Sequence, residues 1–309
     1  MRWFGWFRQA PQKSSSGTMT LDASMADMTD MVAGRKRVVG LPYALPADGE
    51  EVNRLDFQHY MLRFAFQGNY AAPISKPASI LDVGTGTGRW AMEMAQAFPN
   101  ANVIGVDVKP PALDERATAT PDADARPANY TFVPGNLLEG LPFADQSFDF
   151  VHQRLLFTAI PHDRWPSVLQ ELIRVTRPGG WVELVDSIGL VQGGPNVEQL
   201  MVWIRQLSSR RGVDLMDGSR IGDYMRGTTL RQQFSRRIDL PTGAHGGRLG
   251  RMVATDFVSV CRGFGGVAVA QGITSQSAWD TVLERMQADL NQPNNYCVTS
   301  FFITYGQRP

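Results

Sequence analysis

The sequence predicts an α/β fold in which helices cover both faces of a mostly parallel β-sheet. Ile80 to Val83 is a short apolar run that fits a strand buried on both faces, and a glycine-rich turn follows it. Arg89 to Phe98 has helix-forming composition, and Asn102 to Asp107 is a second apolar strand that ends in an acid. Strand, turn, helix and strand in this order open a parallel sheet, and a ligand binds at the carboxyl ends of such strands.

The turn carries glycines at alternate positions, Gly84, Gly86 and Gly88. Glycine lets the backbone turn sharply and leaves room for a ligand. A dinucleotide fingerprint needs a further glycine at position 89, where this chain has Arg89. Asp107 comes 19 residues after Gly88, about where a carboxylate that accepts both ribose hydroxyls should fall. The pattern therefore predicts a nucleoside site at this edge of the sheet.

The later elements continue the same alternation. Trp165 to Val175 is an amphipathic helix, and Pro178, Gly179 and Gly180 form a turn before another apolar strand. The strands expected after Asp107 are Tyr130 to Val133, Phe148 to His152, Trp181 to Asp186, Ser235 to Leu240 and Cys297 to Gly306. No internal repeat is visible.

Together, the glycine turn with Asp82 before it, Asp107, the Phe148-Asp149 strand start and the Pro-Gly-Gly turn resemble class I S-adenosylmethionine-dependent methyltransferases. The resemblance is continuous over residues 80–186, and the last residues, 301–309, resemble the closing strand of that family. It implies a Rossmann-like sheet of seven strands, mostly parallel, with an antiparallel last strand. It also implies S-adenosyl-L-methionine as the cofactor.

The resemblance implies a role for each residue of the cofactor site. The acid before the glycines anchors the turn and the methionyl part of the donor, and Asn136 stands where the family binds the adenine amino group. Arg154, or alternatively Arg89, would bind the donor's carboxylate. The implied cofactor site comprises Asp82, Gly84, Thr85, Gly86, Gly88, Asp107, Val108, Asn136, Leu137, Gln153 and Arg154.

Residues 43–60 narrow the resemblance to one subgroup of this family. Tyr43, a Leu45-Pro46 turn and the residues Arg54 and His59 are similar to the start of a methyltransferase subgroup that includes bacterial natural-product methyltransferases and fungal regulators of secondary metabolism. In that subgroup the segment closes over the cofactor and lines the substrate pocket. Tyr43, Arg54, His59 and Tyr60 are therefore ligand-contact candidates, and ordinary helix packing is the alternative for each of them.

Composition restricts the class of partner. The 309 residues include 30 basic and 30 acidic side chains, so no global field attracts nucleic acid, and a small, fairly neutral or apolar substrate is expected. Cys261 and Cys297 are too few for a disulfide framework or a cysteine metal site and suit a reducing cytoplasm. We expect no metal. We also expect no integral membrane segment, because no apolar run of 18 residues exists.

Two additions to the core are expected. Residues 1–50 form an N-terminal arm and a segment that leads into the core. The aromatic stretch Met1 to Arg8 and a short helix over Asp22 to Val32 would mediate homo-oligomer contacts, and a disordered tail or a membrane-surface contact is the alternative for Met1 to Arg8. Residues 51–192 and 234–309 form the methyltransferase core. Residues 193–233 are expected to form a helical lid over the substrate pocket, with helices over 198–211 and 220–233.

Methyl transfer from a sulfonium is an in-line displacement, so the protein mainly has to align the donor carbon and the acceptor atom. A base is optional. The candidates for a catalytic role are His152 at the end of the fourth strand, His245 in a glycine-rich loop and Tyr43; His162 is a weaker candidate. A lone histidine is more often structural or solvated than catalytic.

The sequence thus predicts a cytoplasmic enzyme that methylates carbon, oxygen or nitrogen of a small hydrophobic natural product or metabolite. One alternative is a methyltransferase-like regulatory or scaffold protein of secondary metabolism, although Asp82, the three glycines and Asp107 are intact. A nicotinamide oxidoreductase is a second alternative, and the glycine spacing disfavours it.

Overall fold

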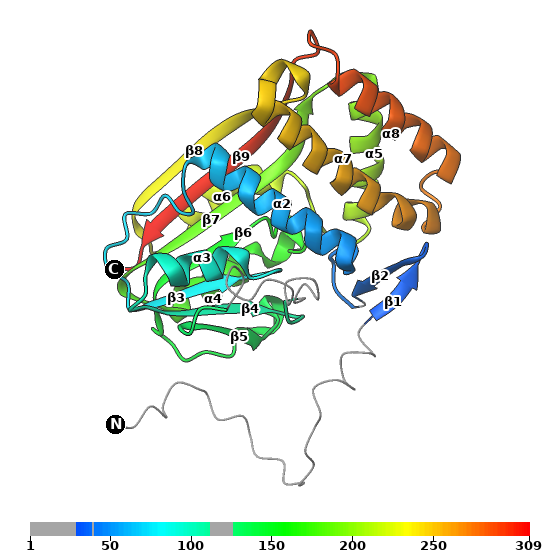
Figure 1. Cartoon of the computed structure of the whole chain (residues 1–309). Coiled ribbons are helices and arrows are strands. Elements are labelled where there is room, and N and C mark those ends of the chain that lie inside the picture. Colours follow the sequence, from blue (N-terminus) through cyan, green and yellow to red (C-terminus); the bar gives the residue numbers. More distant parts are fainter. Residues whose placement is uncertain (1–28, 39, 112–125) are drawn as a thin grey trace, which may run out of the picture.

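A seven-stranded sheet forms the centre of the computed structural model, which describes residues 29–38, 40–111 and 126–309 (Figure 1). The strand order is β5-β4-β3-β6-β7-β9-β8. The strands are β3 (Ser79–Val83), β4 (Asn102–Asp107), β5 (Tyr130–Pro134), β6 (Phe148–Arg154), β7 (Thr176–Gln192), β8 (Arg231–Thr242) and β9 (Cys297–Gln307).

The pairing of the strands confirms the predicted fold class. β3 pairs in parallel with β4 and β6, and β6 pairs in parallel with β7. β9, the last strand in the chain, is antiparallel to both of its neighbours, β7 and β8. It lies between them, so β8 is an edge of the sheet and β9 is not.

Helices cover both faces of the sheet, and short 3-10 helices join some of them to the strands (Figure 1). The helices are α2 (Gly49–Phe66), α3 (Arg89–Ala97), α4 (Trp165–Val175), α5 (Pro195–Ser209), α6 (Asp217–Arg226), α7 (Gly247–Ala270) and α8 (Gln276–Leu290), with η2 (Leu137–Glu139), η3 (His162–Arg164) and η4 (Ala244–Gly246). The predicted helix over 220–233 is therefore shorter, and β8 begins at Arg231 instead of Ser235.

A hydrophobic core lies on each face of the sheet, because successive side chains of a strand point to opposite faces. Leu81 and Val151 pack with α4 and α6 on one face of the sheet. Ile80 and Phe150, their neighbours in the sequence, pack with Trp90 of α3 on the other face. Successive residues of a strand point to opposite faces, so strands that are apolar throughout can be buried on both.

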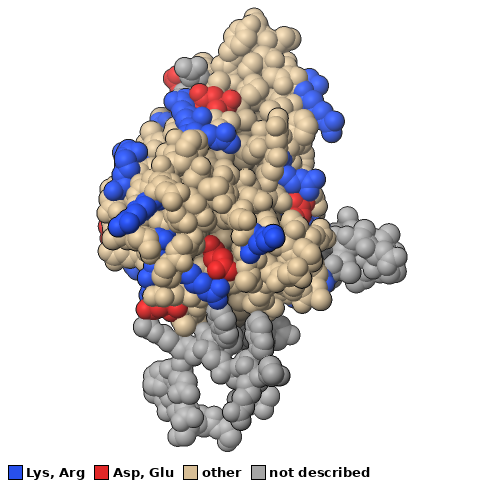
Figure 2. Space-filling model, turned by 90° about the vertical axis from the view of Figure 1, so that its left-hand side faces the viewer, with Lys and Arg blue, Asp and Glu red and all other residues tan. Residues whose placement is uncertain are grey.

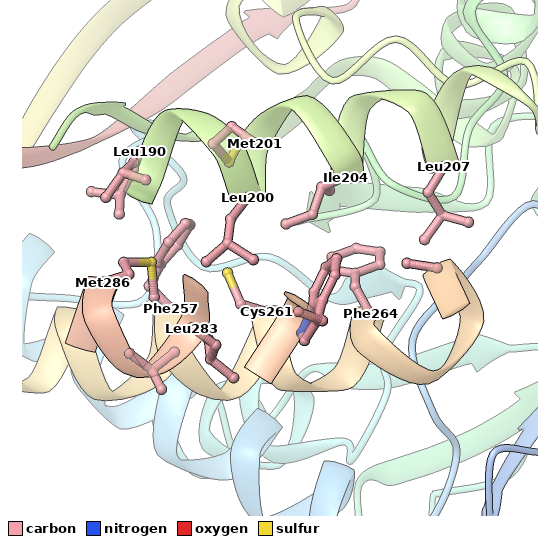
Figure 3. Close-up of a cluster of buried hydrophobic side chains, with 14 of the residues drawn as sticks. Leu190, Leu200, Met201, Ile204, Leu207, Phe257, Cys261, Phe264, Leu283 and Met286 are labelled. Carbon is pink, nitrogen blue, oxygen red and sulfur yellow. The ribbon is translucent and has the colours of Figure 1, made fainter. Parts of the chain in front are cut away.

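A third layer of helices lies beside the sheet and is made of α5, α7 and α8. Figure 3 shows side chains from α5, such as Leu200 and Leu207, pointing toward Cys261 and Phe264 of α7. These side chains recur at helical spacing and are fully or almost fully buried. The layer thereby holds α7 in a fixed position next to α2, against which α7 also packs.

α7 and the short η4 before it, Ala244–Ala270, are long and apolar enough to cross a membrane by length and composition. Of the most apolar part of this stretch, 56% is buried inside the protein, as expected for a core helix. The sequence prediction had found no such stretch, because polar residues interrupt the apolar run.

The described part of the N-terminal segment is a β-hairpin, β1 (Thr29–Val32) and β2 (Arg35–Val38). The prediction of a helix over Asp22 to Val32 is therefore wrong for its last four residues, and its remainder and the Met1 to Arg8 arm lie outside the described residues. Gly34 has a φ of +77°, which suits the hairpin turn. Arg37 donates to the carbonyl oxygen of Gly263 at 2.7 Å and so fastens the hairpin to α7.

The face at the left of Figure 1 is drawn in Figure 2, where basic side chains stand separately among uncharged ones. Fewer acidic than basic side chains are visible in this view. β8 contributes exposed arginines to the surface of the protein, Arg231, Arg236 and Arg237. Charged side chains along an edge strand discourage pairing with another sheet.

Candidate active site

A cavity of about 460 Å³ opens at the carboxyl ends of β3, β4 and β6. The sheet side of its wall includes the glycine turn after β3, Asp107 and the loop after β6. The opposite side of the wall has two parts. One is the cover, which we define as residues 41–48 together with α2, and the other is the adjoining face of α7. This is where a doubly wound sheet binds its ligand.

The glycine turn adopts a backbone that other residues rarely adopt. Gly84, Gly86 and Gly88 have φ angles of +70°, +55° and +78°. A Cβ atom on Gly84 would lie 2.6 Å from a methyl carbon of Leu156, so a larger residue has no room there. Gly84 and Gly86 line the cavity and place main-chain atoms at its surface, whereas Gly88 lies behind them as the N-cap of α3.

Asp107 ends β4 and faces the cavity beside the glycine turn. Its two carboxylate oxygens accept from the backbone N–H of Gly86 at 2.9 Å and of Val108 at 2.7 Å. Burial raises the pKa of Asp107, although both backbone donors favour the ionised form. Each oxygen keeps a further lone pair, so the carboxylate can accept two neighbouring hydroxyls, as a ribose presents them.

Asp82 holds the glycine turn in place through its side-chain contacts. It accepts from the Thr85 hydroxyl at 2.7 Å and lies 3.0 Å from Nδ1 of His152. Both Asp82 and Thr85 are buried and line the floor of the cavity. The carboxylate therefore fixes the conformation of the turn.

Asn136 and Leu137 line the cavity beyond β5. The Asn136 side-chain oxygen accepts from the Leu138 N–H at 3.0 Å, and its amide nitrogen donates to Glu139 at 2.9 Å. These bonds cap η2 and fix the orientation of the amide. The oxygen retains one lone pair for an exocyclic amino group.

Arg154 is the last residue of β6 and also lines the cavity. Its guanidinium donates to Nδ1 of His59 at 3.0 Å, while Nε2 of His59 faces Glu93 at 3.2 Å. Burial and the charge of Arg154 lower the pKa of His59 to about 4, so the imidazole is neutral. No carboxylate lies within ion-pair distance of Arg154 in the described ranges, which leaves donors for a carboxylate ligand. Arg89, the alternative, is bound to Asp56 at 2.9 Å.

Four residues predicted for the site do not line the cavity: Gly88, which is the N-cap of α3, and His152, Gln153 and His245. His152 is 1% exposed and stacks on Trp90 with ring centroids 3.8 Å apart, so it cannot reach a substrate. Burial also lowers its pKa, against the effect of Asp82. Gln153 is buried on the opposite face of the sheet and donates to Asp186 at 2.9 Å. His245 lies in η4, where its ring contacts that of Tyr296.

The residues predicted to cover the cavity are partly confirmed in position. Tyr43, Arg54 and His59 all line it, whereas Tyr60 is 44% exposed on the outer side of α2. None of the lining residues in the described chain comes from 193–233. The expected lid helices have other roles: α5 packs against α7 and α8, and α6 packs against β7 and β9.

Sequence reasoning missed several cavity residues. Glu51 pairs with Arg54 three residues later, and Asp256 of α7 binds the same arginine from 202 positions away. The spacing of Glu51 and Arg54 was a detectable signal, because side chains three residues apart share a helix face. Asp256 gave none, since only the packing of α7 on α2 brings it to the cavity.

Outside the cavity, one group of described residues has ligand atoms close enough together for a metal ion: His162, Asp214 and Asp217. Arg220 already donates to both aspartates, at 2.7 and 3.1 Å. The group joins η3 to the start of α6.

The cavity joins a glycine turn, a ribose-type carboxylate and an apolar wall, and comparison with known proteins identifies the class. The profile of a family described as "Methyltransferase domain" matches residues 80–180. Methyltransferase str2 from Strobilurus tenacellus is 31% identical over 210 residues, which cover 65% of this chain and 71% of that protein. Secondary metabolism regulator LAE1 from Cochliobolus heterostrophus is 31% identical over 151 residues, which cover 47% and 45%.

Among solved structures, phosphoethanolamine N-methyltransferase 2 from Haemonchus contortus aligns with a TM-score of 0.48 and 19% identity, over 82% of this chain and 57% of that one. The chain spans less than half of the LAE1 regulator but more than two thirds of str2. The chain belongs to the class I S-adenosylmethionine-dependent methyltransferases.

Proposed function

We propose that this protein transfers a methyl group from S-adenosylmethionine to a small, mainly apolar natural product or metabolite. The observation that carries the proposal is a single cavity that joins a nucleoside-type site to an apolar wall. The similarity to a regulator of secondary metabolism supports a role in natural-product metabolism. The proposal covers acceptors in which carbon, oxygen or nitrogen receives the methyl group.

The bound donor supplies a methyl carbon on a sulfonium, which an acceptor atom displaces in line. In our proposal Asp107 accepts from the ribose hydroxyls, and the oxygen of Asn136 accepts from the adenine amino group. Arg154 donates to the donor's carboxylate, and His59 fixes the guanidinium for this contact. The backbone of Gly84 and Gly86 lies against the donor because no side chains intervene.

On the acceptor side, side chains of α7 and the cover exclude water and hold an apolar body. Val253, Phe257 and Val260 of α7 face Leu45 and other cover residues across the cavity. Burial raises the pKa of Tyr43, and the negative charge of Glu51 raises it further. Tyr43 therefore keeps its proton, which it donates to Glu51 at 3.5 Å, and it does not act as a base.

The test is binding followed by turnover. Calorimetry should detect binding of S-adenosylhomocysteine, and incubation with deuteromethyl-labelled donor and a panel of apolar metabolites should yield labelled products in mass spectrometry. Asp107→Ala serves as the matched variant with weakened donor binding. Failure of the wild-type protein to bind the adenosyl ligand would contradict the proposal.

A regulatory or scaffold protein is the second candidate, and the LAE1 match favours it. In that case the cavity binds the donor but no metabolite in the panel becomes methylated. Product formation in the turnover assay would exclude this candidate as the sole function.

We also propose a cytoplasmic location and a homo-oligomer assembled through the N-terminal arm. Cys261 and Cys297 are free and buried, which agrees with a reducing compartment. The arm lies outside the described residues, so its role depends on experiment. Deleting residues 1–28 and finding an unchanged particle mass by light scattering would refute the oligomer proposal.

A further inference from the structure

A group of buried and half-buried polar side chains lines the cavity where the cover meets α7. We call it the roof cluster and define it as Tyr43, Glu51, Arg54, Gln58 and Asp256, all of which line the cavity. Glu51, Arg54 and Asp256 are 4%, 8% and 7% exposed. Charged side chains buried to this extent need partners.

The charges of the roof cluster do not balance. Arg54 binds both oxygens of Glu51, at 2.7 and 2.9 Å, and also one oxygen of Asp256 at 3.0 Å. The other oxygen of Asp256 accepts from the neutral amide of Gln58 at 2.8 Å. One guanidinium thus serves two carboxylates, which leaves one net negative charge.

The pKa shifts of Arg54 and Asp256 show how far the partners of each group offset its burial. Burial lowers the pKa of Arg54, but Glu51 and Asp256 outweigh that effect and leave it raised, so Arg54 stays charged. Burial raises the pKa of Asp256 even though Arg54 and Gln58 lower it. Arg54 and Gln58 therefore offset only part of the burial penalty on the ionised form of Asp256, and a cation beside this carboxylate would stabilise that form.

The position of Asp256 places this charge among apolar side chains. Val253, Asp256 and Val260 follow one another at helical spacing on α7, and all three line the cavity together with Phe257. The donor, in the function proposed above, is already served by Asp107, Asn136 and Arg154. The roof cluster is then available to the acceptor.

We infer that the acceptor carries a protonated amine that binds at Asp256 and Glu51, while its apolar body packs on Val253, Phe257 and Val260. This inference rests on the proposed function, because it assumes that the acceptor lies beside a bound donor. The inference assigns the amine a role in binding and does not specify which atom of the acceptor receives the methyl group. A cation in this position would supply the missing positive charge in a site shielded from water.

Another use of the charge would be to balance the donor's own sulfonium. The two uses differ in a measurable way, because S-adenosylmethionine carries the sulfonium and S-adenosylhomocysteine does not. If the roof cluster serves the sulfonium, removing its excess charge weakens binding of the first ligand relative to the second. If it serves the acceptor, the ratio of the two dissociation constants stays the same.

The experiment measures binding of matched pairs to the full chain saturated with S-adenosylhomocysteine at neutral pH. The pairs are tryptamine with tryptophol and phenethylamine with phenethyl alcohol, in which an ammonium group replaces a hydroxyl. We expect each amine to bind the wild-type protein about tenfold more tightly than its alcohol, the size of a charged hydrogen bond. Equal affinities, a preference for the alcohols, or no binding of either amine would overturn the inference.

The variant Asp256→Asn keeps the shape of the side chain and removes its charge. It should reduce the amine preference about tenfold and leave the ratio of the two adenosyl ligands unchanged. Glu284→Gln, on the exposed side of α8, makes the same change in charge outside the cavity and should leave the amine preference intact. A changed ratio of the adenosyl ligands without loss of amine preference would assign the charge to the sulfonium.

The wild-type comparison needs no variant, so it remains decisive if Asp256→Asn fails to fold. Loss of S-adenosylhomocysteine binding by the wild-type protein would contradict the proposed function itself. Binding of that ligand without any amine preference would contradict only the inference about the acceptor.

Discussion

Replacing Asp107 with alanine is expected to weaken binding of S-adenosylhomocysteine by about 1 to 3 kcal/mol, or about 5- to 150-fold in Kd. The variant removes a charged acceptor for two ribose hydroxyls, and hydrogen bonds to charged groups contribute about 1.5 to 3 kcal/mol each before water partly replaces them. It also removes the acceptors of the Gly86 and Val108 N–H groups. Because Asp107 borders the cavity, water can reach these donors and limit the loss of stability.

Calorimetry gives the Kd of S-adenosylhomocysteine, and competition with adenosine and 2′,3′-dideoxyadenosine isolates the ribose hydroxyls. The wild-type protein should prefer adenosine, and the Asp107→Ala variant should bind both nucleosides alike. Asp280→Ala, an exposed acid on α8, is the control for charge. An unchanged Kd, or a preserved preference for adenosine in the variant, would refute the ribose assignment.

Three further changes test the turn, the carboxylate contact and a buried acid. Gly84→Ala should destabilise the protein by about 1 to 3 kcal/mol in urea unfolding, because φ is +70° and the new Cβ would lie 2.6 Å from Leu156. Gly34→Ala is the control: its φ is +77°, but no atom lies within 4 Å of the new Cβ, so it should destabilise the protein less. Arg154→Gln should weaken binding of S-adenosylhomocysteine by about 1 to 3 kcal/mol and leave binding of 5′-methylthioadenosine, which lacks the carboxylate, unaffected. Equal losses of affinity for both ligands would contradict a contact between Arg154 and the donor's carboxylate. Burial raises the pKa of Glu183 from 4.5 to about 7, so the folded state holds a proton that the unfolded state has lost, and wild-type stability should fall as pH rises from 4.5 through 7. Glu183→Gln should remove up to about 3 kcal/mol of that fall, and an unchanged slope of unfolding free energy against pH would count against the burial effect.

The sheet could be predicted because its signals are local. Apolar runs that end in glycine or an acid, such as those before Gly84 and at Asp107, mark buried parallel strands and their carboxyl ends. The number of strands and the antiparallel direction of the last one followed from the family resemblance. The β1–β2 hairpin was missed because the alternation of Met and Ala with acids in residues 22–32 fits either period over so short a stretch.

The positions of His152 and Gln153 show why a place near the end of a strand does not make a site residue. His152 is in register with Asp82 on the neighbouring strand, so both side chains point to the same face, where Trp90 covers the imidazole. Gln153 points to the opposite face, toward Asp186. Arg154, the next residue, is the one that reaches the cavity.

The lid expected over residues 193–233 was misplaced for a different reason. The helices in 193–233 have an apolar face, and such a face predicts burial without saying against what. In the structure the apolar face of α5 packs on α7 and α8, so α7 becomes the cavity wall in its place. Long-range packing of this kind has no signature in a single sequence.

α2 connects the two halves of the site. At its start Glu51 and Arg54 bind Asp256 of α7, on the acceptor side. Further along, His59 binds Arg154 and faces Glu93 of α3, on the donor side. Moving α2 away from its neighbours would separate the buried Arg54–Asp256 ion pair at one position and break the hydrogen bond from Arg154 to the neutral His59 at the other, and separating the buried ion pair leaves uncompensated charges. A donor carboxylate at Arg154 and an amine at Asp256 would add partners to the same two positions, so each ligand would hold α2 in the position that the other requires.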